Sequence, residues 1–222
     1  MSQAYFLTGT DTEIGKTFIT CALLLRARHL GLKAAGIKPV AAGTDAAGRN
    51  DDVERIRAAG NVALPTDVIN PYRFAPAIAP HLAAAEAGVA IDFARIAAAC
   101  ASARRRADLV IVEGVGGFCV PLGVDRDSSD LAVALALPVI LVVGLRLGCL
   151  NHALLTAEAI AARGLTLAGW VANRIDPDMA RPEDNIAALR ERLDAPLLGR
   201  VPRIAGGRPA DAAACLDLPA GI

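Results

Sequence analysis

The stretch of sequence that decides the fold is Gly9-Thr10-Asp11-Thr12-Glu13-Ile14-Gly15-Lys16-Thr17. A short apolar run at residues 5–8 predicts a strand before it, and the helical spacing of residues 17–30 predicts a helix after it. Backbone N–H groups of such a loop and of a helix N-terminus cradle phosphate oxygens. In this pattern Lys16 contacts the β and γ phosphates of a nucleotide, and the Thr17 hydroxyl coordinates magnesium. We therefore expect a site for ATP and magnesium at this loop.

The spacing of the loop differs from the usual pattern. Gly9 and Gly15 enclose five residues, where four are usual, and the four-residue spacing would place Thr10 at the first glycine. The alternative is a glycine-rich turn with an exposed lysine. The strand before the loop and the helix after it favour the phosphate site.

Strand-like and helix-like segments alternate along the rest of the chain. This order predicts βαβ units, and hence an α/β fold with a mostly parallel sheet and helices on both faces. Continuous apolar runs at residues 109–112 and 139–143 are typical of central strands. Because no repeat or linker divides the sequence, we expect a single nucleotide-binding domain over residues 1–222. Further strands are expected at 34–38, 67–70, 167–172 and 197–201, and helices at 51–59, 92–106 (capped by Asp92), 151–163 and 182–193, with the tail 206–222 unassigned.

The composition limits which binding partners and which cellular compartment can be expected. Lys plus Arg and Asp plus Glu both number 23, so no bulk charge favours nucleic acid or an anionic membrane. The longest apolar stretch, residues 131–145, is interrupted by Pro138 and is shorter than the roughly 20 residues of a membrane span. The five cysteines are odd in number and lack CxxC spacing, which predicts neither a disulfide framework nor a zinc site. Without a signal peptide, we expect a cytoplasmic protein.

Three charged residues follow predicted strands or begin a predicted helix. Glu113 ends a strand and precedes three glycines in the next four residues, which suits metal or water positioning near phosphates. Asp52 is a second candidate for magnesium, with a helix cap as the alternative. Lys38 closes another strand, where it could stabilise charge in a transition state, and a surface lysine is the alternative.

The chain resembles the dethiobiotin synthetase family from residue 4 to about residue 204. The lengthened phosphate loop is itself typical of that family. The other matching stretches are Lys38-Pro39-Val40, Asn70-Pro71-Tyr72, Val112-Glu113-Gly114-Val115-Gly116-Gly117, residues 138–144, Leu147-Gly148-Cys149-Leu150-Asn151-His152 and Ala168-Gly169-Trp170-Val171-Ala172-Asn173.

The resemblance implies a reaction and roles for individual residues. The family joins 7,8-diaminononanoate, CO2 and ATP through a carbamate and a carbamic–phosphoric anhydride, giving dethiobiotin, ADP and phosphate. Lys38, Lys16 and Thr12 would be catalytic, and the family is a homodimer. Magnesium would be held by Thr17, Asp52 and Glu113. Nucleotide contacts would come from Glu13, Ile14, Gly15, Lys16, Thr17, Phe18, Asp52, Glu113, Gly114, Val115, Gly116, Asn173, Arg174 and Pro202. Substrate contacts would come from Thr12, Lys38, Ala42, Gly116, Gly117 and, across the dimer, Asn151.

One position departs from the family, and other functions compete. The family often has a serine or threonine where this chain has Ala42, and Thr44 is a nearby candidate to replace the hydroxyl. A regulatory or partitioning ATPase would carry a lysine at the position of Asp11. An amide ligase acting on a tetrapyrrole would need a further glutamine-hydrolysing domain. A nucleotide-binding module without catalysis would not need both Lys38 and Glu113. We expect Trp170 in the core, and Phe118 either in the core or in a substrate wall.

Overall fold

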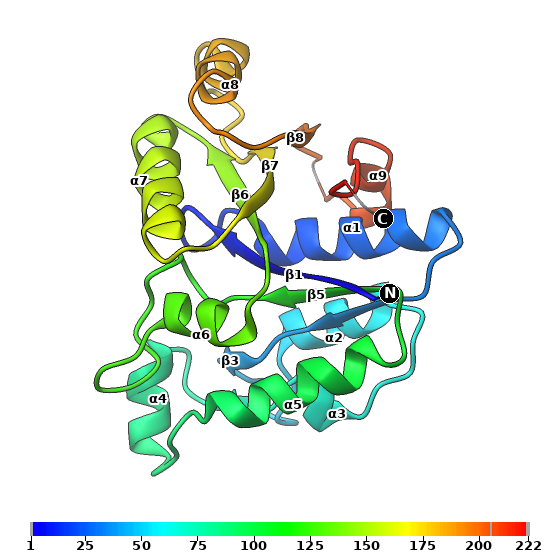
Figure 1. The fold of residues 1–222 in the computed structure, drawn as a ribbon, viewed down its shortest axis with the longest axis vertical. Helices are drawn as coiled ribbons and strands as arrows, with labels where there is room; N and C mark the ends of the chain where they lie inside the picture. Colours follow the sequence, from blue (N-terminus) through cyan, green and yellow to red (C-terminus); the bar gives the residue numbers. More distant parts are fainter. Residues whose placement is uncertain (1, 205, 221–222) are drawn as a thin grey trace.

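A computed structural model describes residues 2–204 and 206–220 of the chain. Within these residues, six strands form a parallel sheet in the order β2-β5-β1-β6-β7-β8, and β3 and β4 form a small second sheet (Figure 1). The predicted α/β architecture is thereby confirmed. The strands are β1 (Gln3–Gly9), β2 (Ala34–Ile37), β3 (Val40–Ala42), β4 (Tyr72–Phe74), β5 (Leu109–Glu113), β6 (Val139–Leu145), β7 (Leu167–Arg174) and β8 (Leu197–Val201).

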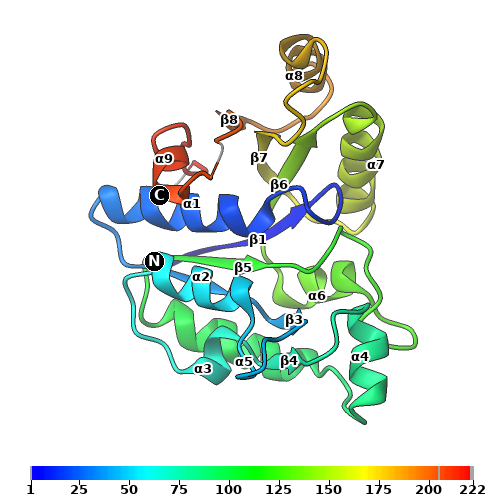
Figure 2. The same cartoon turned by 180° about the vertical axis from the view of Figure 1, so that it is seen from behind.

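Helices cover both faces of the main sheet (Figures 1 and 2). Successive side chains of a strand point to opposite faces. In β1, Ala4 and Phe6 accordingly pack with α5 and α6, whereas Tyr5 and Leu7 pack with α1 and α2. Trp170 lies fully buried on the face covered by α7 and α8, as expected for a core residue. The helices are α1 (Lys16–His29), α2 (Asp51–Ala59), α3 (Thr66–Ile69), α4 (Pro80–Glu86), α5 (Phe93–Arg104), α6 (Ser128–Leu135), α7 (Cys149–Ala162), α8 (Pro182–Arg190) and α9 (Pro209–Ala213).

The sequence predicted most of these elements and misassigned one. Residues 67–70 form no strand. They overlap the short helix α3, in which Val68 and Ile69 both donate backbone hydrogen bonds to the carbonyl of Pro65. The strands β3 and β4 and the helices α4 and α6 were not predicted. The tail contains α9, which packs against α1 (Figure 2).

Parallel pairing brings the ends of β1, β2 and β5 to one edge of the sheet. Leu7 in β1 pairs with Glu113, so the loop after β1 begins beside this carboxylate. Ile37 in β2 pairs with Val112, so Lys38 and Glu113 leave the sheet side by side. Ligands bind beyond the carboxyl ends of strands in such sheets, and this edge is therefore where a site is expected.

No helix in residues 2–204 and 206–220 is both long and apolar enough to cross a lipid bilayer.

Candidate active site at the carboxyl edge of the sheet

The loop from Thr10 to Gly15 connects β1 to α1 and is fixed at several points. The Thr10 amide donates to the carbonyl of Val142 at 3.0 Å, which ties the loop to β6. Gly15 caps α1 in a left-handed conformation, with φ of 86°. The Asn173 side-chain amide donates to the Ile14 carbonyl at 2.7 Å. The loop is thus held with the N-terminus of α1 directed at its concave side, as phosphate binding requires.

Lys16 is nearly buried, and its Nζ donates to the carbonyl of Asp11 at 2.7 Å. Burial lowers the pKa of Lys16 to about 8, and the nearby charge of Lys38 acts in the same direction. The lysine is therefore folded back on its own loop, at the place where nucleotide phosphates would neutralise it.

Lys38 lies between two carboxylates. Its Nζ is 2.6 Å from Glu113 Oε1 and 3.3 Å from Asp52 Oδ2, and it also donates to the Gly114 carbonyl at 3.2 Å. Burial lowers the pKa of Lys38, but the charges of Glu113 and Asp52 outweigh burial, so the pKa is raised. Lys38 is thus a buried ammonium ion and not the surface lysine that was the alternative.

Asp52 faces this cluster from the first turn of α2. The cap of the helix is Asn50, whose side-chain oxygen accepts from the Val53 amide at 3.2 Å, so Asp52 is not the cap. Burial raises the pKa of Asp52, but the positive charge of Lys38, with a contribution from that of Arg55, outweighs burial, so the pKa is lowered. Its carboxylate is therefore charged and directed at the site.

The oxygen atoms near Thr17 fit a magnesium ion. Thr17 Oγ1 donates to Glu113 Oε1 at 2.7 Å, and Asp52 approaches from α2. Glu113 is fully buried, and its Oε2 has no hydrogen-bond partner among the described residues. A buried carboxylate oxygen without a partner costs free energy unless a proton donor or cation satisfies it. A hydroxyl and two carboxylates are oxygen ligands of the kind that magnesium prefers beside phosphates.

A cleft of about 390 Å³ opens over the phosphate loop. Most of the predicted site residues line it: Thr12, Glu13, Gly15, Lys16, Thr17, Phe18, Lys38, Ala42, Asp52, Val115 and Gly116. Four lining residues were not predicted: Ala41, Asn50, Arg55 and Ile78. Arg55 is three residues after Asp52 on α2, and side chains at this spacing share a helix face, so helical periodicity could have suggested its position. Ile78 lies in an irregular loop for which the sequence carries no such signal.

The other predicted residues lie around the cleft. Ile14 is buried, and Glu113 and Gly114 lie behind the cleft, where they accept hydrogen bonds from the lining residue Lys38. Asn173, in β7, stabilises the loop through its hydrogen bond to Ile14. Asn173 pairs with Val201 in β8, so the next residues of the two strands, Arg174 and Pro202, lie at the same edge of the sheet. Within the described part of the chain, Gly117, Arg174, Pro202, Asn151 and Thr44 are not among the cleft-lining residues. Phe118 is buried in the core cluster that contains α5 and α6.

Replacing Gly15 by alanine is expected to weaken ATP binding about tenfold and to lower the free energy of unfolding by about 1–2 kcal/mol. A Cβ atom would lie 2.4 Å from Asn173 Nδ2, in a backbone conformation that alanine disfavours. Calorimetry with ATP and thermal unfolding measure the two effects. Gly31→Ala is the matched control, because Gly31 has φ of 80° and open space around it. It should lose stability and keep ATP affinity; equal ATP affinity in both variants would contradict the role of the loop.

A parallel sheet that presents a Gly-Lys-Thr loop, with a carboxylate at the end of the adjacent strand, defines a P-loop nucleotide-binding protein. Solved structures agree on the fold. The septum site-determining protein MinD of Pyrococcus horikoshii in complex with Mg-ADP is 16% identical, with a TM-score of 0.56 over 92% of this chain and 83% of that one. A ParA family ATPase from Chlorobium tepidum is 13% identical, with a TM-score of 0.54 over 92% and 85%. At this identity the likeness concerns the fold alone.

Sequence comparisons define the family. A family model described as an AAA domain matches residues 3–209. The ATP-dependent dethiobiotin synthetase BioD of Aromatoleum aromaticum is 62% identical over 220 residues, which is 98% of each chain. The protein of the same name from Janthinobacterium sp. (strain Marseille) is 58% identical over 219 residues, or 96% of this chain and 93% of that one. The chain belongs to the ATP-dependent dethiobiotin synthetase family.

Proposed function

We propose that this chain closes the ureido ring of dethiobiotin from 7,8-diaminononanoate, CO2 and ATP, releasing ADP and phosphate. The observation that carries the proposal is the buried Lys38 ammonium beside Glu113 and Asp52, in the same cleft as the phosphate loop. A nucleotide-binding module without catalysis has no need to bury such a cluster. The sequence identity to the two synthetases supports the same activity.

The reaction builds negative charge that the cleft is suited to neutralise. One substrate amine adds to CO2 and loses a proton, which gives a carbamate. A carbamate oxygen then attacks the γ phosphorus of ATP, and ADP leaves. The second amine attacks the carbonyl carbon of the resulting anhydride and loses a proton, and the ring closes as phosphate leaves. Lys38 would hold the carbamate and the transferring phosphoryl group, while Lys16 would leave the Asp11 carbonyl to bind the β and γ phosphates.

Magnesium would be held by Thr17, Asp52 and Glu113, whose side chains gather around Lys38 beside the phosphate loop. When bound, the ion would neutralise charge on the phosphate oxygens. Lys38, which lines the cleft, and Glu113 behind it are almost inaccessible to water, and this burial would help to protect the anhydride from hydrolysis.

The remaining roles are assigned by position. Residues 13–18, with Gly114, Val115 and Gly116, would enclose the phosphates, and Asn173, Arg174 and Pro202 would lie by the adenine. Thr12, Ala42, Gly116 and Gly117 would contact the diamine. Thr44, the nearby candidate for the hydroxyl absent at Ala42, is not among the residues that line the cleft.

The proposal includes a cytoplasmic homodimer without a nucleic-acid or membrane partner. Asn151 is exposed near the start of α7, where it could reach the substrate of a second copy. Leu147 and Leu155 are exposed on the same segment, with relative accessibilities of 95% and 56%. Apolar side chains exposed to this extent suit a surface that a second copy covers.

ADP release from magnesium-ATP and bicarbonate is expected only when 7,8-diaminononanoate is present. The reason is that the phosphoryl acceptor is the carbamate of this diamine, without which the cleft holds no nucleophile but water. The measurement is a coupled ADP assay with and without the diamine, together with the mass of the product. ADP release that ignores the diamine would overturn the proposal in favour of a regulatory ATPase. That function has less support, because Asp11 forms an ion pair with Arg146 where a lysine would be expected.

A further inference from the structure

The chain changes sheets immediately after Lys38. Residues before it belong to the main sheet, and residues after it, in β3, pair with β4. The Lys38 amide donates to the Ile69 carbonyl at 2.8 Å, and the Tyr72 amide donates to the Pro39 carbonyl at 3.0 Å. The backbone that carries Lys38 is therefore aligned by residues 69–72.

Pro39 and Pro71 interrupt the backbone hydrogen bonding between these two segments next to Lys38. The Lys38 carbonyl faces residues 70–72, which have no free backbone donor to offer it. The Asn70 amide is bound to the Thr66 carbonyl at 2.8 Å, Pro71 has no N–H, and the Tyr72 amide is already engaged. A buried carbonyl without a donor is costly, so a side chain has to supply one.

Asn70 supplies that donor. Its Nδ2 donates to the Lys38 carbonyl at 2.7 Å and to the Tyr72 carbonyl at 2.9 Å. The residue is 6% exposed, so water does not compete for these hydrogen bonds. Both acceptors are carbonyls, and the side chain therefore has to present its NH2 group to them; a carboxylate of the same shape cannot replace it.

We propose that Asn70 is a positioning residue for ring closure, which acts by fixing the backbone of Lys38 so that its ammonium reaches the reacting groups. The inference rests on the proposed function, because it assumes that Lys38 is catalytic. Lys38 is held at both ends: its carbonyl by Asn70, and its Nζ by Glu113, Asp52 and the Gly114 carbonyl. Without Asn70, the backbone end keeps the hydrogen bonds to Ile69 and Tyr72 on either side, but the Lys38 carbonyl between them loses its donor. Small displacements of a catalytic group cost large factors in rate.

The test replaces Asn70 by aspartate and by alanine. Aspartate keeps the shape but cannot donate, and alanine removes the amide. For both variants we expect kcat to fall about tenfold or more at saturating substrates, because Lys38 is misplaced in the transition state. The Kd for ATP, measured by calorimetry, should stay within about twofold, because the phosphate loop is untouched. All assays are run at a temperature at which circular dichroism shows the variants folded.

Asn61→Asp is the matched control. Asn61 also uses its side chain to bind backbone groups of neighbouring segments: Nδ2 donates to the Leu32 carbonyl at 3.0 Å, and Oδ1 accepts from the Ala34 amide at 2.7 Å. These hydrogen bonds lie at the opposite end of β2 from Lys38. The kcat of Asn61→Asp should therefore equal that of the unaltered protein. A merely structural role for Asn70 would lower the unfolding temperature and leave kcat per folded molecule at the level of the control. That result would overturn the inference, as would a parallel rise in the Kd for ATP.

A serine at position 70 provides a further test if neither Asn70→Asp nor Asn70→Ala folds. Its hydroxyl can donate one hydrogen bond, so Asn70→Ser should recover part of the lost kcat, and a kcat equal to that of the unaltered protein would overturn the inference. Failure of the proposed function gives a different result, because the unaltered protein would then show no ADP release that depends on the diamine.

Discussion

Replacing Lys38 by methionine is expected to lower turnover about a hundredfold or more and to leave ATP binding nearly unchanged. Methionine keeps most of the apolar stem and removes the ammonium that faces Glu113 and Asp52. That charge would be needed on the carbamate and the transferring phosphoryl group, whereas ATP would be bound mainly by the loop around Lys16. Steady-state kinetics and ATP calorimetry measure the two quantities.

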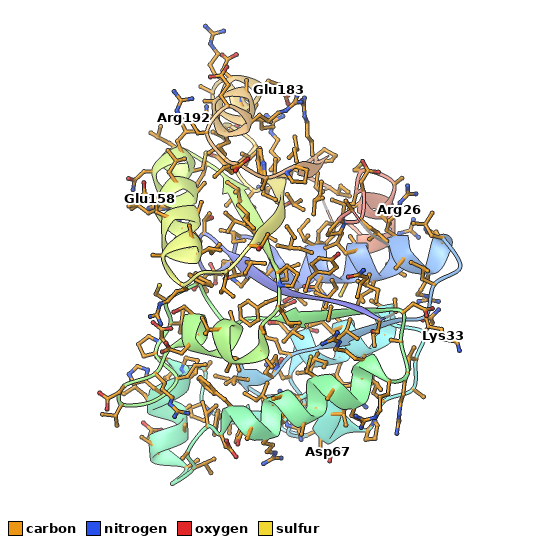
Figure 3. All side chains as sticks on the ribbon, viewed as in Figure 1. Arg26, Lys33, Asp67, Glu158, Glu183 and Arg192 are labelled. Atoms are coloured by element: carbon orange, nitrogen blue, oxygen red, sulfur yellow. The ribbon has the colours of Figure 1, made fainter. Side chains whose placement is uncertain are left out.

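Lys33→Met is the matched control, because Lys33 is exposed (Figure 3), lies at the opposite end of β2 from Lys38, and is not among the residues that line the cleft. Lys38→Met also breaks a buried ion pair, which costs on the order of 3–5 kcal/mol of stability. Turnover therefore has to be expressed per folded molecule, as determined by active-site titration with a tight-binding nucleotide. Equal turnover of the two variants would remove Lys38 from the catalytic role.

The parts of the fold that the sequence predicted are those governed by local patterns. The buried strands β5 and β6 are continuous apolar runs, and α5 begins at the expected cap, where Asp92 accepts from the Ala94 amide at 2.8 Å. The short elements around β3 and β4 depend on contacts that a local pattern does not contain. β3 has three residues and exists because β4 pairs with it, about 30 residues further along the chain. Residues 67–70 contain a β-branched pair that favours a strand, but the backbone bonds to Pro65 close a helical turn instead.

The candidate site also has parts that local sequence patterns predict and parts that depend on the folded chain. The phosphate loop could be predicted because all its parts are contiguous in the sequence. Lys38, Asp52 and Glu113 could be proposed one by one from their positions at strand ends and in a helix, but nothing in the sequence indicated that Lys38 lies between the two carboxylates. That arrangement follows from sheet order, because β2 pairs with β5 only in the folded chain. Asn70 belonged to a matching stretch without a role, since its hydrogen bonds to Lys38 and Tyr72 depend on the turn between two sheets.

Glu113→Gln is expected to raise the magnesium concentration for half-maximal turnover about tenfold or more. The fully buried carboxylate accepts from Thr17 and Lys38 through Oε1 and leaves Oε2 without a partner among the described residues. Glutamine keeps the shape but presents a neutral oxygen to a divalent ion. A magnesium titration of turnover measures the shift, and binding of Mn²⁺ followed by electron paramagnetic resonance measures metal affinity without relying on activity. Glu183→Gln, at an exposed position on α8 (Figure 3), should titrate like the unaltered protein.

Lys38→Met and Glu113→Gln distinguish the role of the metal from the role of the lysine, although a hydrogen bond joins Lys38 to Glu113. Lys38→Met removes a cation that lies beside the carboxylates, so their oxygens stay available and the affinity for Mn²⁺ should be kept or increased. Glu113→Gln removes a ligand and should weaken the binding of Mn²⁺, whatever happens to turnover. If the Glu113→Gln titration superimposes on that of the unaltered protein, Glu113 serves only to hold Lys38. The turnover of the two variants would then fall together, without any change in the response to metal.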